Sequence, residues 1–347
     1  MARTTTGERD LNVDRDVQRA RDDTPALATP LRPSPIPATP TLSAYADAET
    51  LDGVLDRAAL RRTPGLYTRA WRIFRANKVS MTALVILIAI VIFVLSAGLI
   101  STYVTGFTAA ENHLSDKLKP VMTDGYILGS DGNGRDVLTR LAYGGRVSLM
   151  IAALAALALF FIGGLVGLIS GYAGGKTDTI LMRIVDVLLS IPTLPLLILV
   201  ASLFAPGPVG LAFWIAVISW AGIARLFRGE TLSLRGRDYV DAARALGASN
   251  ARIVMKHIVP NLVPLLVIYT SLSLPGLMLA ETGLSFLGVG VQVPTPSWGN
   301  MLGDGQQFFR TNFSLVLIPG LMIYITSLSM YLVGNGLRDA FDPKLTQ

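Results

Sequence analysis

Residues 238–261 read DYVDAARALGASNARIVMKHIVPN, and this polar stretch lies between two long apolar segments of the chain. The pattern predicts a short helix from about Gly236 to Leu246 that ends at Gly247, a residue suited to a left-handed turn. Ser249 then takes the N-cap position of a second helix, which continues into the next apolar segment. The sequence therefore predicts a helix-turn-helix on a membrane surface.

The first helix of this predicted pair carries small side chains. Ala242, Ala243 and Ala245 give it a face that fits closely into a groove of a partner. Basic residues surround this face, which is typical of the cytoplasmic side of a membrane protein. They are Arg235, Arg237, Arg244, Arg252 and Lys256. We predict a rigid contact surface through which another protein can push.

The composition excludes an ordinary soluble fold. Of the 347 residues, 51% are hydrophobic and only 16% are charged, and the mean hydropathy is +0.52. Long apolar runs favour an all-α bundle over a β-barrel, because each helix satisfies its own backbone hydrogen bonds in lipid. The net charge of +6 gives no support to nucleic-acid binding, since the basic residues cluster beside the apolar runs. The absence of cysteine excludes disulfides and thiolate chemistry.

Two parts of the chain differ in composition. Residues 1–65 hold prolines among threonines, alanines and charges, and are expected to form a disordered tail. Residues 66–347 are expected to form a transmembrane domain whose basic residues place both termini in the cytoplasm. Its six predicted spans are at about 79–100, 147–170, 179–204, 209–226, 258–280 and 313–334.

Glycine and proline interrupt several of these spans. Gly163, Gly167 and Gly171 stand four residues apart, so they share one helix face and favour close contact with another helix. Prolines are expected to interrupt or kink other spans. They are Pro192, Pro195, Pro260, Pro264, Pro275 and Pro319. Together these residues favour a transport pathway over a simple anchor, although packing explains any single one equally well.

The sequence predicts no catalytic or metal centre. The stretch SGYAGGKT at 170–177 approaches a phosphate-binding loop, but Ser170 stands where the pattern requires glycine. We expect a turn at Gly174–Gly175 instead. The two histidines, His113 and His257, are predicted on opposite sides of the membrane and therefore cannot share a metal. Any ATP hydrolysis is expected from a partner chain.

Ionisable residues near the ends of spans are candidates for function. Arg183 and Asp186 fall three apart on a predicted helix and are expected to pair. Glu281 lies near the end of another span, where it can face a cavity, and with Ser285 and Phe286 it forms our candidate substrate pathway. Simple anchoring at the membrane interface explains the three charged residues about as well.

Several motifs together resemble one family of membrane proteins. The opening stretch is similar to the EAA loop of binding-protein-dependent transporters at Ala242, Ala243, Gly247 and Pro260, with Asp241 in place of the usual glutamate. From about Arg69 onward, the chain resembles the C-type permease subunit of the oligopeptide/dipeptide ABC importers. Other stretches that resemble this branch are GSDGNGRDVL (129–138), YGGRVSL (143–149), ETGLSFLG (281–288) and GLRD (336–339).

The resemblance implies a non-catalytic, six-helix type I importer permease in a bacterial inner (plasma) membrane, with no cofactor of its own. The implied partners are a B-type permease, two ABC ATPases that bind ATP and Mg, an external substrate-binding protein and membrane lipid. Contact with the ATPases is expected through a coupling loop at about residues 236–257. Its candidate coupling residues are Tyr239, Asp241, Ala242, Ala243, Leu246, Gly247 and Ala248.

Other functions stay open at this point. A self-contained channel or ion-coupled carrier needs no ATPase, and a membrane scaffold uses the tail to recruit partners. Within the importer interpretation, related permeases carry nickel chelates or haem instead of peptides. The sequence does not choose among these substrates.

Overall fold

The computed structural model describes residues 65–123 and 125–341, and within these ranges the chain is helical with no β-strand. Five segments are long and apolar enough to cross a membrane, with mean hydropathies from 1.8 to 2.7 in their most apolar windows. Their helices are α4 (Lys78–Leu95), α6 (Val137–Ala173), α9 (Pro208–Arg235), α12 (Val259–Phe286) and α14 (Ser314–Phe341). The predicted class of all-α membrane protein is confirmed.

Shorter elements fill the connections. The helices among them are α3 (Leu66–Ala76), α5 (Ala97–Leu99), α7 (Gly175–Ser190), α8 (Thr193–Phe204), α10 (Asp238–Ala245), α11 (Asn250–Ile253) and α13 (Trp298–Gln306). Single turns of other geometry are the π-helices η2 (Ile100–Thr105) and η4 (Val254–Ile258) and the 3-10 helix η3 (Leu114–Asp116). The predicted tail, apart from Gly65, lies outside the described residues.

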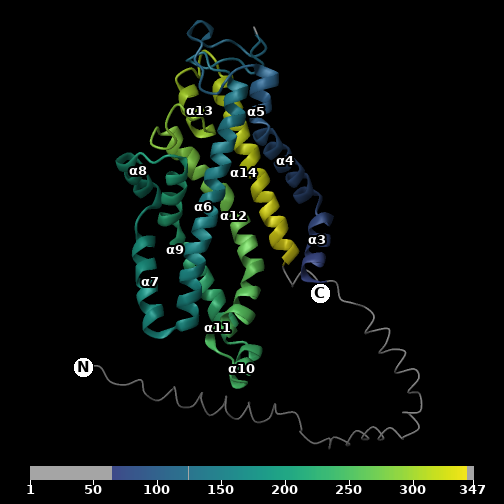
Figure 1. Cartoon of the computed structure of the whole chain (residues 1–347), viewed down its shortest axis with the longest axis vertical. Helices are drawn as coiled ribbons and strands as arrows, with labels where there is room; N and C mark the ends of the chain where they lie inside the picture. The colour runs from purple at the N-terminus through teal and green to yellow at the C-terminus, as the bar shows by residue number, and fades with distance from the viewer. Residues whose placement is uncertain (1–64, 124, 342–347) are drawn as a thin grey trace, which may run out of the picture. The chain divides into compact units, whose positions relative to one another are not determined.

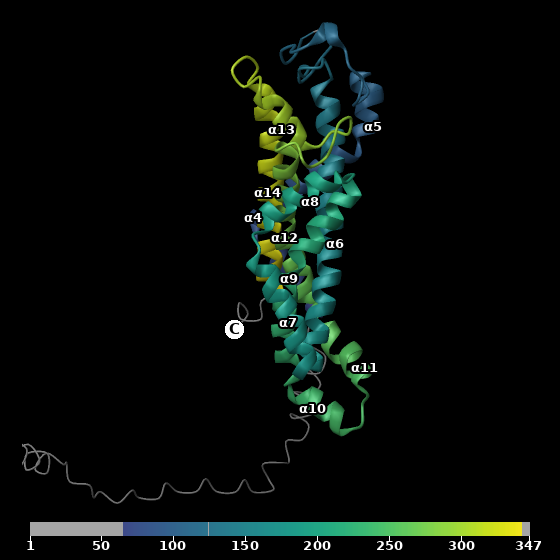
Figure 2. The same cartoon turned by 90° about the vertical axis from the view of Figure 1, so that its left-hand side faces the viewer.

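The long helices pack side by side, as Figure 1 shows. Helix α12 contacts both α6 and α14, while α4 packs on α14 and the α7–α8 pair packs on α9. One buried apolar core joins α6, α8, α9 and α12, and a second joins α4, α6, α12, α13 and α14. Helices α10 and α11 lie at one end of the bundle, the α10 end, and α13 lies toward the opposite end, the α13 end (Figure 2).

Contact between α6 and α9 depends on the glycine stripe. A β-carbon at Gly163 would lie 2.8 Å from the carbonyl oxygen of Trp220, and one at Gly167 would lie 2.5 Å from that of Ala224. A β-carbon at Gly171 would also lie within 3 Å of α9. These distances are shorter than carbon and oxygen atoms tolerate, so only glycine allows the two helices to approach this closely. The predicted role of the stripe is confirmed.

The segment predicted as one span at 179–204 consists of two helices, α7 and α8, which meet at an angle of 84°. Ile191 lies between them in an extended conformation, with φ −92° and ψ 128°. The cause is Pro192, because a proline disfavours helical geometry at the preceding residue and itself has no N–H to donate. The pair counts as a sixth span only if the bent helices are taken together.

The other prolines have weaker effects than expected. Helix α12 continues through Pro264 and Pro275, and α14 continues through Pro319. Pro260 lies in the first turn of α12, directly after the π-helical turn η4. Beside it, the side chain of Asn261 donates a hydrogen bond to the carbonyl oxygen of His257 at 2.6 Å. Among these positions, only Pro192 ends a helix.

Two ion pairs fix α7 against α9. Arg228 binds both carboxylate oxygens of Asp178, at 2.5 and 2.6 Å. Arg225 donates to Asp186 at 2.5 Å. The predicted pairing of Asp186 with Arg183 on the same helix is therefore wrong, because α9 presents a closer guanidinium. The sequence spacing shows neighbours on one helix and says nothing about a helix that packs across it.

Candidate functional site

Helices α10 and α11 form the helix-turn-helix that the opening sequence predicts. The last turn of α10 ends in a Schellman motif, in which Ala248 N–H donates to Ala243 O and Gly247 N–H donates to Arg244 O, each at 3.0 Å. Gly247 has φ +81°, the left-handed conformation predicted for it. The hydroxyl of Ser249 accepts from Arg252 N–H at 3.4 Å and so caps α11, as expected. Backbone geometry therefore fixes the angle between the two helices.

Helix α10 offers most of its surface to the surroundings. Val240 is the residue of α10 that is fully buried, and it packs into the core of α6, α9 and α12. By contrast, Leu246 is 89% exposed and Tyr239 is 43% exposed. The exposed parts of Leu246 and Tyr239 leave apolar surface uncovered at the α10 end.

The remaining candidate coupling residues divide by exposure. Asp241, Ala242 and Gly247 are exposed, whereas Ala243 and Ala248 are half-buried and pack against the core. Asp241 pairs with Arg244 at 2.7 Å on the exposed side of the helix. The structure thus brings all seven predicted residues into one short surface element, five of them accessible to a partner and two directed toward the body of the protein.

The end of α6 supports this element. The hydroxyl of Tyr172 contacts the side-chain oxygen of Asn250 at 2.8 Å, and Arg235 donates to the Tyr172 carbonyl oxygen at 2.8 Å. The same guanidinium lies over the Tyr172 ring, 5.9 Å from its centroid. On the other side, α11 continues through η4 into α12 without interruption. The segment of α10 and α11 is therefore connected to α6, α9 and α12.

A hollow of about 550 Å³ lies among α6, α8, α9 and α12. Its lining is apolar with a few small polar positions. The polar positions are Thr193, Ser219 and Ser273, and the lining also includes Gly222 and Gly276. A β-carbon at Gly222 or Gly276 would meet no atom within 4 Å, unlike the glycines of the α6 stripe. The sequence analysis missed these residues, because glycines that adjoin open space and glycines that hold helices together look alike in a sequence.

The candidate pathway residues Glu281 and Ser285 do not line this hollow. Glu281 is 0% exposed, and it accepts a hydrogen bond from the Ser285 hydroxyl at 2.7 Å. Ser285 in turn accepts from Val291 N–H at 3.0 Å. Ser148 of α6 accepts from Trp298 N–H at 3.2 Å nearby. The Ser148–Trp298 bond joins α6 to α13, while Glu281 and Ser285 hold the loop that follows α12, at the α13 end of the bundle.

Phe286, the third candidate, is half-buried at the last residue of α12. Its carbonyl oxygen would lie 2.9 Å from a β-carbon at Gly303 of α13. The residue therefore belongs to the contact between α12 and α13 and does not face the hollow.

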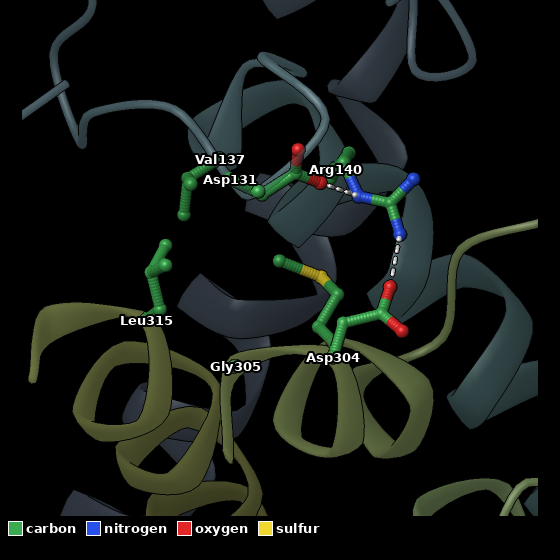
Figure 3. A pocket seen from close by; sticks show the side chains of 8 residues that line it. Asp131, Val137, Arg140, Asp304, Gly305 and Leu315 are labelled. Atoms are coloured by element: carbon green, nitrogen blue, oxygen red, sulfur yellow. Dashed lines mark ion pairs between the residues drawn. The ribbon is translucent and has the colours of Figure 1, made fainter. Parts of the chain in front are cut away.

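Four charged residues meet at the α13 end, and three of them, Asp131, Arg140 and Asp304, line a small cavity of about 20 Å³ (Figure 3). Asp131 binds Arg135 at 2.7 Å and Arg140 at 3.4 Å, and Asp304 of α13 binds the same two arginines at 3.1 and 3.7 Å. The side chain of Arg140 is 1% exposed. The sequence analysis did not indicate Asp304 as a partner of these residues.

The fold defines the class of this protein as a polytopic helical membrane protein. The family model "Binding-protein-dependent transport system inner membrane component" matches residues 163–347. A second model, "N-terminal TM domain of oligopeptide transport permease C", matches residues 65–120. The chain belongs to the family of binding-protein-dependent inner membrane components, and its resemblance to C-type permeases is confirmed.

The sequences of curated relatives match this chain over most of its length. The oligopeptide transport system permease protein OppC of Haemophilus influenzae is 38% identical over 303 residues, 86% of this chain and 96% of the relative. OppC of Escherichia coli K12 is 37% identical over 86% of this chain and 97% of its own length. The dipeptide transport system permease protein DppC of Bacillus subtilis is 36% identical over 83% and 89%. This chain is accordingly a non-catalytic transmembrane permease component.

Proposed function

We propose that this chain forms one half of the translocation pathway of an ATP-driven peptide importer and couples to cytoplasmic ATPases through α10. The observation that carries the proposal is the exposed, rigidly terminated helix α10, joined without a flexible linker to α9 and to the segment from α11 to α12. Leu246 and Tyr239 supply apolar contact area, and Ala242 allows a close approach of the partner. The α10 end is then cytoplasmic, as the basic residues predicted.

The proposed complex contains a B-type permease, two ATPases that bind ATP and Mg, and an external binding protein at the α13 end. ATP closes the ATPase pair, and the closure displaces α10. Because Tyr172 of α6 holds the helices on both sides of α10, through Arg235 of α9 and Asn250 of α11, the displacement rearranges the spans around the hollow. ATP acts in this way only if its binding energy differs between the two arrangements.

Peptides are the proposed cargo because the relatives that match over most of the chain are named for oligopeptide and dipeptide transport. The hollow supports a permissive pathway, since its lining is mainly apolar and offers few polar groups that would fix one ligand. Choice among peptides is assigned to the binding protein. The chain itself takes part in passage and in coupling.

The test is purification of the tagged chain from its native membrane, followed by ATPase and peptide-uptake assays with and without the binding protein. We expect ATPase and permease subunits to co-purify and loaded binding protein to stimulate hydrolysis. Uptake of a nickel chelate or haem in place of peptides would refute the proposal that peptides are the cargo. Transport by this chain alone in liposomes would refute the importer and favour a channel or carrier.

A matched pair of variants tests the coupling surface itself. Leu246→Glu places a charge at the exposed tip of α10, whereas Leu287→Glu makes the same change at a leucine that is 60% exposed just after α12. We expect the Leu246→Glu variant to co-purify with the second permease but not with the ATPases. Leu287→Glu should keep both. Equal ATPase recovery from the two variants would exclude α10 as the contact.

A further inference from the structure

Helix α3 has two different faces. Ala70 and Phe74 are buried against the last turns of α14, where they pack in a cluster with Leu337 and Ala340. At the edge of this buried face, Tyr67 meets the ring of Phe341 edge-on and Trp71 stacks on Phe74, yet Tyr67 is still 63% exposed and Trp71 54% exposed. The other face exposes three arginines, Arg69, Arg72 and Arg75. The partly uncovered aromatic rings therefore lie beside several guanidinium groups.

The position of α3 is fixed by its neighbours. A β-carbon at Gly336 of α14 would lie 2.9 Å from the Phe74 ring, so the glycine makes room for α3. The side chain of Asn77 accepts from Val79 and Ser80 N–H at 3.1 and 3.2 Å and starts α4 directly after α3. The apolar residues of α4 begin at Val79. Helix α3 therefore lies where the hydrocarbon layer meets the lipid headgroups.

The charge of this face is unbalanced. No aspartate or glutamate occurs between residues 65 and 110. In the part of the chain that the structure describes, none of the three arginines forms an ion pair with a carboxylate. Three guanidinium groups on one exposed surface attract anionic groups, and guanidinium matches the geometry of phosphate oxygens.

We propose that α3 binds anionic phospholipid headgroups. Arg69, Arg72 and Arg75 contact the phosphodiester groups, while Trp71 and Tyr67 lie at the interface, the depth that these amphipathic rings prefer in membranes. The exposed aromatic rings distinguish a lipid surface from an acidic soluble protein, which would leave them in water. Through Phe74 and Ala70, the bound lipid holds the end of α14 in place.

The absence of cysteine makes a direct test possible, because Thr68→Cys introduces a single labelling site on the exposed face of α3. The full chain carries a fluorophore at this site in nanodiscs of phosphatidylcholine and phosphatidylglycerol. Quenching is compared for two nitroxide lipids, one with each headgroup. We expect a preference for phosphatidylglycerol of roughly fivefold for each arginine that contacts the lipid, from about 1 kcal/mol for each basic residue near the surface.

Two triple variants test whether the positive charges of the three arginines cause the lipid preference. Arg69→Gln, Arg72→Gln and Arg75→Gln together should reduce the preference to about one, whereas the matched replacement of all three by lysine should keep most of it. Both variants leave Ala70 and Phe74 unchanged, so the packing on α14 is retained. Neither ATP nor any partner subunit is present, so the result is independent of the proposed importer function.

Three results would overturn the proposal. They are equal quenching by the two lipids in the unsubstituted chain, a preference that persists in the glutamine variant, and an absence of quenching by either lipid. The last result would show that α3 does not lie at the lipid surface.

Discussion

At the scale of single residues, two neighbouring glycines of α6 are expected to behave in opposite ways. A β-carbon at Gly167 would lie 2.5 Å from Ala224 O, but one at Gly164 would lie 3.8 Å from the Phe227 ring, an ordinary contact. Gly167→Ala should destabilise the protein by about 1–3 kcal/mol through overpacking. Gly164→Ala should be neutral or stabilising, because alanine favours a helix. The thermal unfolding temperature, Tm, of each purified variant in detergent checks this, and equal values would contradict the packing argument.

Gly247 is constrained by its backbone alone, since a β-carbon there would meet no atom within 4 Å. With φ at +81°, Gly247→Val costs about 1–2 kcal/mol locally and changes the angle between α10 and α11. We expect the complex to assemble but to hydrolyse more ATP for each peptide taken up. Gly247→Asn should keep most of the coupling, because asparagine tolerates the left-handed region. The ratio of uptake to hydrolysis is the measurement, and a normal ratio for the valine variant would refute the prediction.

At the scale of elements, the four-charge cluster joins the loop before α6 to α13. Asp131→Asn leaves two guanidinium groups short of a buried partner and should cost about 3–5 kcal/mol. Asp304→Asn makes the same change at a side chain that is 42% exposed and should cost about 0–1 kcal/mol. The Tm values of the two variants measure how much stability each substitution removes. A similar loss in both would mean that burial does not set the strength of these pairs.

At the scale of the whole molecule, the hollow among four helices should be the part of this chain that substrate passes. A β-carbon at Gly276 would meet no atom within 4 Å, and Gly276→Leu extends a side chain into the hollow, so stability should change little while peptide uptake falls. Gly283→Leu makes the same change in equally open surroundings on the same helix, outside the hollow, and serves as the control. Uptake by the assembled complex, normalised to the amount of protein, is the readout. Equal uptake by the two variants would exclude the hollow as the pathway.

Local features were predictable wherever backbone geometry depends on a few adjacent residues. Gly247 and Ser249 indicated the end of one helix and the start of the next, and both have that role in the structure. Pairing across helices was not predictable in the same way. Asp186 binds Arg225 from another helix instead of Arg183 from its own. Likewise Glu281, expected to face a cavity, is buried among serines.

The sequence by itself determined the membrane class, the approximate positions of the long apolar helices other than α7 and α8, and the helix pair around α10. These properties follow from apolar length, charge and local backbone preferences, all of which act over a few turns of chain. Only the tertiary structure decided which glycines of the spans hold helices together and which adjoin the hollow, and which charges meet at the α13 end. The physical reason is that such contacts join residues far apart in the chain, and the rotation of each helix about its own axis decides which of them face each other.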